Sequence, residues 1–267
     1  MSEISKAGTA LVTGSSSGIG AAYAERLAGR GYDLLLVARN EDRLKELGAK
    51  LEAAHGVKVE TLKADLSDAA DVRKVEKRVR DDEAITLIVN NAGIGPKGKL
   101  LDDDVDYLDD MIALNVVSVN RLAIAAAQTF AARGRGAIIN IASVVAFIPE
   151  VFNGTYSATK SFVLSLTQSL ASELKDSGVK VQAVLPGLTR TEIFDRAGGS
   201  MDHLDPEMIM DVTDMVDAAL AGFDQGELIT IPSLSDTTLL DAANAARGAL
   251  GPHLSLRKPA SRYGVGA

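Results

Sequence analysis

Tyr156 and Lys160 lie four residues apart in a segment predicted to be helical, which places a phenol and an amine on one helix face. An ammonium beside a phenol favours the phenolate, because the opposite charge stabilises the ionised form. We therefore expect Lys160 to lower the pKa of Tyr156 from its ordinary value of about 10. A lower pKa would suit Tyr156 to proton transfer near neutral pH. Ser143 lies shortly upstream, after the apolar run at residues 137–142.

A glycine-rich loop follows the first apolar run of the chain and precedes a predicted helix. Its sequence is Gly14-Ser15-Ser16-Ser17-Gly18-Ile19-Gly20. In this context the first glycine allows a tight turn, the second lets the backbone approach a pyrophosphate, and the third permits close packing of helix on strand. The free N–H groups of the helix start would hold the anion. The loop predicts a dinucleotide site, and a plain strand–helix turn is the alternative.

The second predicted strand ends at Arg39, and this residue bears on the choice of dinucleotide. A carboxylate there would bind the ribose 2′-hydroxyl of NAD, whereas a guanidinium makes bidentate bonds to a phosphate. The sequence therefore favours NADP(H) over NAD(H), with a solvated surface arginine as the alternative. Asp65 follows the third strand and is placed to meet the adenine amine, unless it is a loop or cap carboxylate.

Short apolar runs that alternate with longer amphipathic segments must position these residues. This alternation predicts an α/β protein, a three-layer doubly wound Rossmann fold with a mostly seven-stranded parallel sheet. The strands are expected at residues 9–12, 33–38, 57–62, 86–89, 137–142, 179–185 and 228–231. Helices are expected at residues 18–30, 68–80, 104–132 and 155–175, and after an Asn40 cap.

We expect one dinucleotide-binding and catalytic domain over residues 1–267, with two segments that break the alternation. Residues 189–211 are loop-like and follow the carboxyl end of a strand, where ligands bind in open α/β sheets. We interpret them as a substrate lid, and a mobile surface insertion is the alternative. Residues 252–267 form a mildly basic C-terminal tail.

Composition excludes several classes of function. The formal net charge of −8 argues against nucleic-acid binding. The chain has no cysteine and three scattered histidines, so we expect neither disulfides nor a metal site. No leader is evident in residues 1–6, and no apolar stretch approaches the roughly 20 residues of a membrane span. We therefore expect a cytoplasmic protein with no membrane partner.

Taken in order, these pieces resemble the short-chain dehydrogenase/reductase family, in its compact single-domain branch. The resemblance covers residues 8–232 and rests on Thr13, Gly14, Gly18, Ile19, Gly20, Asp65, Asn90, Asn91, Ala92, Gly93, Asn115, Ser143, Tyr156, Lys160, Pro186, Gly187 and Thr191. One departure is Ser17, because many NADP-dependent relatives carry a basic residue just before the middle glycine. Phosphate recognition would then depend on Arg39, helped by the hydroxyls of Ser15 or Ser16.

The resemblance implies a catalytic set of Asn115, Ser143, Tyr156 and Lys160. Tyr156 would be the general acid in reduction and the general base in oxidation, and Lys160 would hold the nicotinamide ribose. Ser143 would hydrogen-bond the substrate carbonyl, and Asn115 would hold a water molecule that links Lys160 to solvent. Each residue also has a purely structural alternative. The implied cofactor-binding residues are Gly14, Ser15, Ser16, Ser17, Gly18, Ile19, Gly20, Arg39, Asp65, Leu66, Asn91, Ala92, Gly93, Tyr156, Lys160, Pro186, Gly187, Thr189 and Thr191.

The expected substrate is a bulky and mostly uncharged carbonyl compound, because the residues expected beside Ser143 are apolar. They are Val145, Phe147, Ile148, Phe152, Leu188, Ile193 and Phe194, with Arg190 and Arg196 as charged exceptions. We expect hydride transfer between NADP(H) and a hydrophobic ketone or secondary alcohol. The alternatives are an NAD-dependent dehydrogenase acting in the oxidative direction, a nucleotide-sugar epimerase or dehydratase, and a non-catalytic dinucleotide-binding regulator. Relatives commonly pair through the helices at 104–132 and 155–175, so we expect a homodimer or homotetramer.

Overall fold

The computed structural model describes residues 7–191 and 205–265, and its centre is a parallel sheet. Seven strands are hydrogen-bonded in the order β3-β2-β1-β4-β5-β6-β7. They are β1 (Thr9–Thr13), β2 (Asp33–Ala38), β3 (Val59–Lys63), β4 (Ile85–Asn90), β5 (Gly136–Ile141), β6 (Val179–Val184) and β7 (Ile229–Thr230). The predicted doubly wound fold is confirmed. The chain reverses its direction of travel across the sheet between β1 and β4, and the carboxyl ends of strands at such a point commonly bind ligands.

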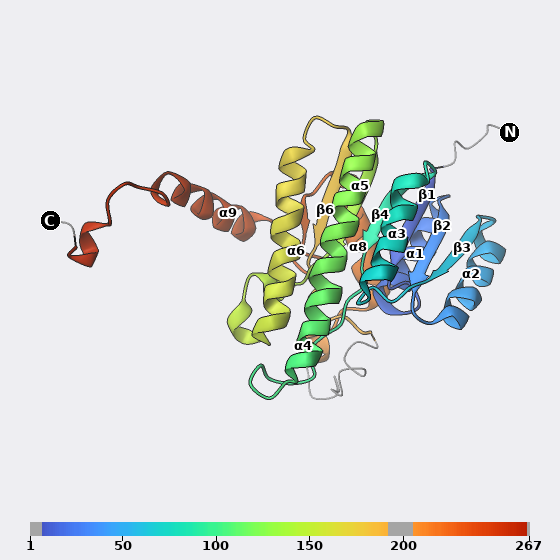
Figure 1. Cartoon of the computed structure of the whole chain (residues 1–267), viewed down its shortest axis with the longest axis horizontal. Helices are drawn as coiled ribbons and strands as arrows, with labels where there is room; N and C mark the ends of the chain where they lie inside the picture. The colour runs from blue at the N-terminus through green and yellow to red at the C-terminus, as the bar shows by residue number, and fades with distance from the viewer. Residues whose placement is uncertain (1–6, 192–204, 266–267) are drawn as a thin grey trace. The chain divides into compact units, whose positions relative to one another are not determined.

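Helices cover both faces of this sheet (Figure 1). Their bounds are α1 (Gly18–Gly29), α2 (Glu41–His55), α3 (Ala69–Asp81), α4 (Val105–Ile112), α5 (Val119–Arg133), α6 (Gly154–Glu173), α8 (Val212–Gln225) and α9 (Thr238–Leu250). Buried residues of α3, α5 and α6 pack on one face, and those of α1, α2 and α8 pack on the other. Figure 1 shows α3, α5 and α6 side by side along the sheet.

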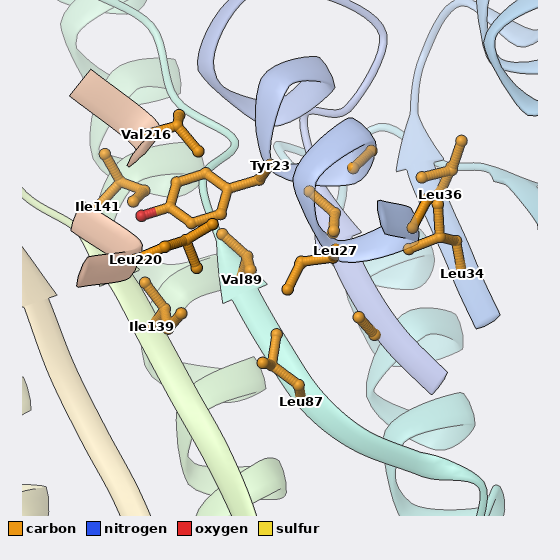
Figure 2. Packing of buried hydrophobic residues seen from close by; sticks show 14 of the residues in the cluster. Tyr23, Leu27, Leu34, Leu36, Leu87, Val89, Ile139, Ile141, Val216 and Leu220 are labelled. Atoms are coloured by element: carbon orange, nitrogen blue, oxygen red, sulfur yellow. The ribbon is translucent and has the colours of Figure 1, made fainter. Parts of the chain in front are cut away.

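Tyr23 of α1 belongs to the hydrophobic core between the sheet and helices α1, α2 and α8 (Figure 2). Its ring is fully buried between Val216 and Leu220 of α8 and Ile141 of β5. The Tyr23 hydroxyl has no hydrogen-bond partner in the part of the chain that the structure describes, and burial raises the pKa of Tyr23 well above its usual value. The apolar packing of this ring therefore holds α1, which begins at the glycine loop, against the sheet.

Several elements differ from the sequence prediction, some at their boundaries and some in their presence. β3 begins at Val59 instead of residue 57, because the Lys58 amide donates to the Asp33 carboxylate at 2.8 Å. The expected single helix at 104–132 is interrupted by a π-helical turn, η1 (Ala113–Ser118). The sequence analysis predicted neither α8 nor α9. Helix α9 buries none of its residues, so it lacks the core-facing apolar stripe by which helices are commonly predicted. By length and composition the helix over Val105–Arg133 could cross a membrane, but more than half of its apolar window is buried, as in a core helix.

The described chain divides into two compact units, with the boundary between Pro232 and Ser233. The first unit contains the whole sheet, and the second contains α9 and two short 3-10 turns, η5 (Gly251–His253) and η6 (Ser261–Tyr263). A single domain over 1–267 remains a prediction. Of the predicted lid, 192–204 lies outside the described residues. The flanking chain forms a bridge from Thr189 to Met210, followed along the sequence by α8.

Candidate active site

The glycine loop turns tightly from β1 into α1, and its shape depends on two glycines. Gly14 adopts φ +66, which L side chains rarely tolerate, and its N–H donates to the Val37 carbonyl at 2.8 Å. A Cβ on Gly20 would lie 2.4 Å from the Gly14 carbonyl oxygen, so only glycine lets the helix approach the strand this closely. The expected packing role of Gly20 is therefore confirmed.

The segment after β4 braces this loop from the side. The Asn91 side-chain amide donates to the Thr13 carbonyl at 2.8 Å, and the backbone N–H groups of Asn91 and Ala92 donate to the Thr13 hydroxyl at 2.9 and 3.0 Å. Thr13 is almost fully buried. Asn91 and Ala92 thus position the dinucleotide loop through bonds to its first turn, a structural contribution that sequence reasoning had not assigned to them.

The loop fits a dinucleotide in two respects. Gly18, at the first position of α1, adopts φ +54 and leaves the helix start free of a side chain. Ser15 is fully buried, and its hydroxyl has no hydrogen-bond partner among residues 7–191 and 205–265. A buried hydroxyl without a partner is costly unless a ligand supplies one. Ser16, Ser17 and Ile19 are half-buried on the same turn.

Helix α6 carries Tyr156 and Lys160, and Asn153 fixes where it begins. The Asn153 side chain accepts from the Tyr156 N–H at 3.2 Å as an N-cap. Its amide nitrogen also donates to the Gly98 carbonyl at 3.1 Å and to the Asp103 carboxylate at 3.3 Å. Asn153 therefore ties the start of the helix to the loop before α4. Sequence reasoning missed it, although an asparagine just before a predicted helix was a usable signal.

Lys160 lies nearly buried beneath Tyr156, with a side-chain exposure of 7%. Its ammonium donates to the Ile141 carbonyl at the end of β5 at 3.0 Å and lies 5.6 Å from the centre of the Tyr156 ring. Burial lowers the pKa of Lys160 to about 8. The four-residue spacing has thus placed both groups on one face, as predicted, with the lysine held by backbone.

The expected lowering of the Tyr156 pKa is wrong for this arrangement. Burial raises the pKa of Tyr156 to about 12, and only the hydrogen bond with Ser143 acts in the opposite direction. Lys160 does not counteract the effect of burial on the pKa of Tyr156. Desolvation disfavours the charged form of Lys160, and its Nζ donates to the Ile141 carbonyl. The phenol is therefore held in its protonated form.

Ser143 follows β5 by two residues and is the N-cap of a short 3-10 turn, η2 (Val144–Ala146). Its hydroxyl lies 3.4 Å from the Pro186 carbonyl and 3.4 Å from the Val145 N–H. The Pro186 carbonyl also accepts from the Val144 N–H at 3.1 Å. These contacts hold the Ser143 hydroxyl between the ends of β5 and β6, where it interacts with Tyr156.

Asn115 lies in the π-helical turn, almost fully buried, and bridges two segments of the site. Its side-chain oxygen accepts from the Ile94 N–H at 3.0 Å, and its nitrogen donates to the Ile94 carbonyl at 2.9 Å and to Thr159 of α6 at 3.3 Å. A Cβ on Gly93 would lie 3.0 Å from the Asn115 oxygen and 3.7 Å from the Lys160 Nζ. Asn115 therefore bonds backbone, and the expected water relay stays a prediction.

The chain after β6 returns toward the glycine loop. Pro186 and Thr189 are buried, and the Thr189 hydroxyl donates to the Gly187 carbonyl at 3.2 Å. Thr191 lies beside Gly18, since a Cβ on that glycine would be 3.4 Å from Thr191. The structure thus brings Thr191 to the start of α1.

Apolar side chains surround the approach to Tyr156. The Phe152 ring meets the Tyr156 ring edge to face, with 5.6 Å between centres. Phe147, Ile148 and Phe152 are each more than 40% exposed, and Val145 and Leu188 are half-buried. Ile193, Phe194 and Arg196 lie outside the described residues. Arg190 is exposed, and its backbone N–H donates to the Met210 carbonyl at 2.9 Å.

At the other end of the site, Arg39 and Asp65 line a pocket of about 380 Å³. The Asp65 carboxylate accepts from the Ser67 N–H at 3.0 Å and from its hydroxyl at 2.7 Å, and it lies 3.9 Å from Arg39. Partial burial raises the pKa of Asp65, but the two bonds from Ser67 and the charge of Arg39 outweigh it and hold the pKa below its usual value. Leu66 is buried in the core on the α3 face.

Comparison with known proteins decides the family. The family model described as short chain dehydrogenase matches residues 8–200. The chain belongs to the short-chain dehydrogenase/reductase family. It is therefore an NAD(P)-dependent oxidoreductase that acts on CH–OH groups. Among the described residues of this short-chain dehydrogenase, no group of three or more His, Asp or Glu side chains could hold a metal ion.

Solved members of the family superimpose over nearly the whole chain. A short-chain dehydrogenase from Sphingobium yanoikuyae in complex with NADPH is 49% identical, with a TM-score of 0.93 over 96% of this chain and 99% of that one. The bulky-bulky ketone specific alcohol dehydrogenase from Comamonas testosteroni is 42% identical, with a TM-score of 0.89 over 97% of this chain and 99% of that one.

Curated relatives are more distant in sequence. An uncharacterised oxidoreductase of Staphylococcus epidermidis is 35% identical over 204 residues, which are 76% of this chain and 87% of that protein. The very-long-chain 3-oxoacyl-CoA reductase-B of Danio rerio is 33% identical over 202 residues, which are 74% of this chain. That match spans 65% of the zebrafish protein, so this dehydrogenase covers less than two-thirds of its length.

Proposed function

We propose that this dehydrogenase transfers a hydride between NADP(H) and a hydrophobic ketone or secondary alcohol, with Tyr156 as the general acid in reduction and the general base in oxidation. The observation that carries the proposal is the grouping of three side chains at the carboxyl end of β5. The Tyr156 hydroxyl interacts with Ser143, and the Lys160 ammonium lies 5.6 Å from the phenol ring. Few arrangements of a phenol, a hydroxyl and a buried amine serve structure alone.

The proton is held at the Tyr156 hydroxyl. With a pKa of about 12 this phenol stays protonated at neutral pH, so it can donate a proton to a substrate oxygen that gains negative charge during reduction. The Ser143 hydroxyl donates a hydrogen bond to the same oxygen and stabilises that charge. The Ser143 hydroxyl, whose hydrogen bond lowers the pKa of Tyr156, also stabilises the resulting phenolate, and the nearby Lys160 keeps its positive charge below a pH of about 8. Bound NADP(H) supplies the hydride in reduction and accepts it in oxidation.

The dinucleotide is held by residues from four loops. The backbone of Gly14 to Gly20 would hold the pyrophosphate at the start of α1, beside which Thr191 lies. Lys160 of α6 would hold the nicotinamide ribose. Arg39 supports NADP(H) over NAD(H), because a guanidinium is suited to a phosphate. The NADPH complex of the Sphingobium yanoikuyae relative adds support. Asp65 is proposed to meet the adenine amine.

The hydrophobic substrate is supported by the side chains around Tyr156. Phe147, Ile148 and Phe152 are exposed aromatic and aliphatic groups, and a large apolar substrate would cover them. The relative from Comamonas testosteroni, a bulky-bulky ketone specific alcohol dehydrogenase, supports the same class of substrate. We also propose a cytoplasmic homodimer or homotetramer, supported by exposed apolar residues on α4, η1 and α6.

The test is the oxidation of NADPH, followed by its absorbance, with a panel of bulky aromatic ketones and short charged keto acids. The wild type should reduce the bulky ketones. Tyr156→Phe removes the phenol hydroxyl and keeps the ring, and it should lower kcat by about 10²–10⁴-fold. NADPH binding, measured by fluorescence titration, should persist in that variant.

Two results would contradict the proposal. Full turnover in Tyr156→Phe would exclude Tyr156 as the proton donor. Activity confined to the keto acids would exclude the hydrophobic substrate. Binding of NADPH without turnover of any carbonyl compound would instead favour a regulator.

A further inference from the structure

Two lysines that belong to no dinucleotide motif line the same pocket as Arg39. The pocket of about 380 Å³ is bounded by Arg39, Lys63, Asp65, Asp71 and Lys74. Lys63 is the last residue of β3 and is paired in register with Ala38, the residue before Arg39. The two cations therefore leave neighbouring strands at the same edge of the sheet.

Lys74 of α3 is held at this pocket by a backbone contact. Its Nζ donates to the Lys63 carbonyl at 3.3 Å, which uses one of the three donors of an ammonium and leaves the others available. Lys63 and Lys74 are both exposed. Neither has an ion pair among the described residues, although Lys63 lies close enough to Glu41 to act on its carboxylate. Glu41 itself pairs with Lys45 at 2.7 Å.

Both carboxylates of the pocket already accept hydrogen bonds from the protein. Asp65 accepts both hydrogen bonds from Ser67, and Asp71 accepts from the Asp65 N–H at 2.8 Å. The second oxygen of Asp65 lies 3.9 Å from Arg39 and offsets part of its charge. With three cations and two carboxylates in its lining, the pocket still carries a net positive charge toward a ligand. Its volume is that of a small-molecule site of about 300–1,000 Å³.

We propose that Lys63 and Lys74, together with Arg39, form the binding site for the 2′-phosphate of NADP(H). The inference rests on the proposed function and names residues that the glycine loop does not supply. Ser17 stands where a second cation would be expected in the loop, and the lysines of β3 and α3, which line the pocket together with Arg39, supply cations in its place. They are specificity-determining residues, because NAD(H) has no 2′-phosphate for them to bind.

The experiment measures the affinities of NADPH and NADH by fluorescence titration, and of 2′,5′-ADP and 5′-AMP by competition. Lys63→Gln and Lys74→Gln should each lower the NADPH-to-NADH affinity ratio by about twofold to fivefold at low salt, as for a single exposed charge pair. The double variant should lower it further, and Arg39→Gln serves as the reference. Matched controls are Lys58→Gln, at the other end of β3, and Lys77→Gln, one turn further along α3; both should keep the wild-type ratio.

The outcomes separate this inference from the proposed function. If the wild type prefers NADPH and the double lysine variant keeps the same ratio, the inference is overturned and the function stands. Equal weakening of both cofactors would also overturn it, because the lysines would then act on the shared part of the molecule. A wild type without preference for NADPH would overturn the NADP(H) assignment together with this inference. Binding is measured without turnover, so failure of the Tyr156 mechanism does not affect the result.

Discussion

Burial acts on Tyr156 and Lys160 in the same sense, since it favours the neutral form of each. It raises the pKa of the phenol to about 12 and lowers the pKa of the amine to about 8. The charged form of each group therefore has a higher free energy in the site than it would have in water. Buried ionisable groups of this kind lower the stability of the folded protein but are needed for catalysis, which is the common trade-off between activity and stability at an active site.

The buried amine predicts a specific dependence of stability on pH. In the unfolded chain Lys160 keeps its proton up to its ordinary pKa of 10.5, whereas in the folded protein it loses the proton near pH 8. Between these values the unfolded state binds more protons, so stability rises with pH. Tyr156 acts in the opposite direction above pH 10, because its folded pKa of about 12 exceeds its ordinary value of 10.0. The gain should therefore be visible between pH 8 and 10.

Lys160→Met removes the amine and keeps the length of the side chain. At pH 7 this variant should be more stable than the wild type by about 1–2 kcal/mol, the cost of burying the charge less the lost bond to Ile141. The advantage should shrink from pH 8 to pH 10. Urea unfolding of both proteins across this range measures it. Stability curves that run parallel would show that Lys160 titrates as it does in water.

At the scale of elements, the site depends on where α6 begins. Asn153 caps this helix and holds the loop before α4, so it sets the register of Tyr156 without contacting the reacting atoms. Asn153→Ala should cost about 0.5–2 kcal/mol of stability and should lower kcat more than it changes the KM of NADPH. Chemical unfolding and steady-state kinetics measure the two effects.

The matched variant is Asn153→Ser, which can still cap the helix but cannot reach both Gly98 and Asp103. It should recover most of the stability, because serine is among the preferred N-caps. A kcat that stays low in Asn153→Ser would assign the effect to the loop contacts. A kcat at the wild-type level in Asn153→Ala would show that the cap does not position Tyr156.

Sequence patterns predicted the elements that carry strong local signals. The buried strands were found because their apolar runs are continuous, and the α2 start was found because Asn40 caps it, with its side chain accepting from the Arg43 N–H at 3.0 Å. The π-helical turn around Asn115 was not predicted, because it depends on the bonds between Asn115 and Ile94, which lie 21 residues apart in sequence. Helix α9 was missed because it has no buried face.

In the candidate site, too, the features that depend on local sequence were predicted and those that depend on tertiary packing were not. The spacing of Tyr156 and Lys160 fixed their common face, but the direction of the pKa shifts was set by burial, which sequence does not report. Asn91 was expected to help bind the cofactor, which stays a prediction; the bonds of its side-chain amide to the Thr13 and Gly14 carbonyls depend on tertiary packing and were not predicted. Lys63 and Lys74 carry no motif, and only the pairing of β2 with β3 and the packing of α3 bring them to Arg39.

At the scale of the whole molecule, the outer layer formed by α4, η1, α5 and α6 leaves large apolar residues exposed. Ile112 is 40% exposed, Val117 is 49% exposed and Phe162 is 37% exposed. Such side chains on neighbouring helices of one layer are typical of an interface between subunits. Packing this layer against a second copy would bury them and would fix the helices that carry Asn115, Tyr156 and Lys160.

The double variant Val117→Asp and Phe162→Asp should therefore dissociate the assembly, because each carboxylate would have to lose its water without gaining a partner. Size-exclusion chromatography with light scattering should change from a mass of two or four chains to one near 28.0 kDa. Ala49→Asp, on an exposed position of α2, adds one carboxylate on the other face of the sheet and should keep the wild-type mass. A double variant that keeps the wild-type mass would exclude this layer as the interface, and a wild type that already elutes as one chain would exclude the homo-oligomer.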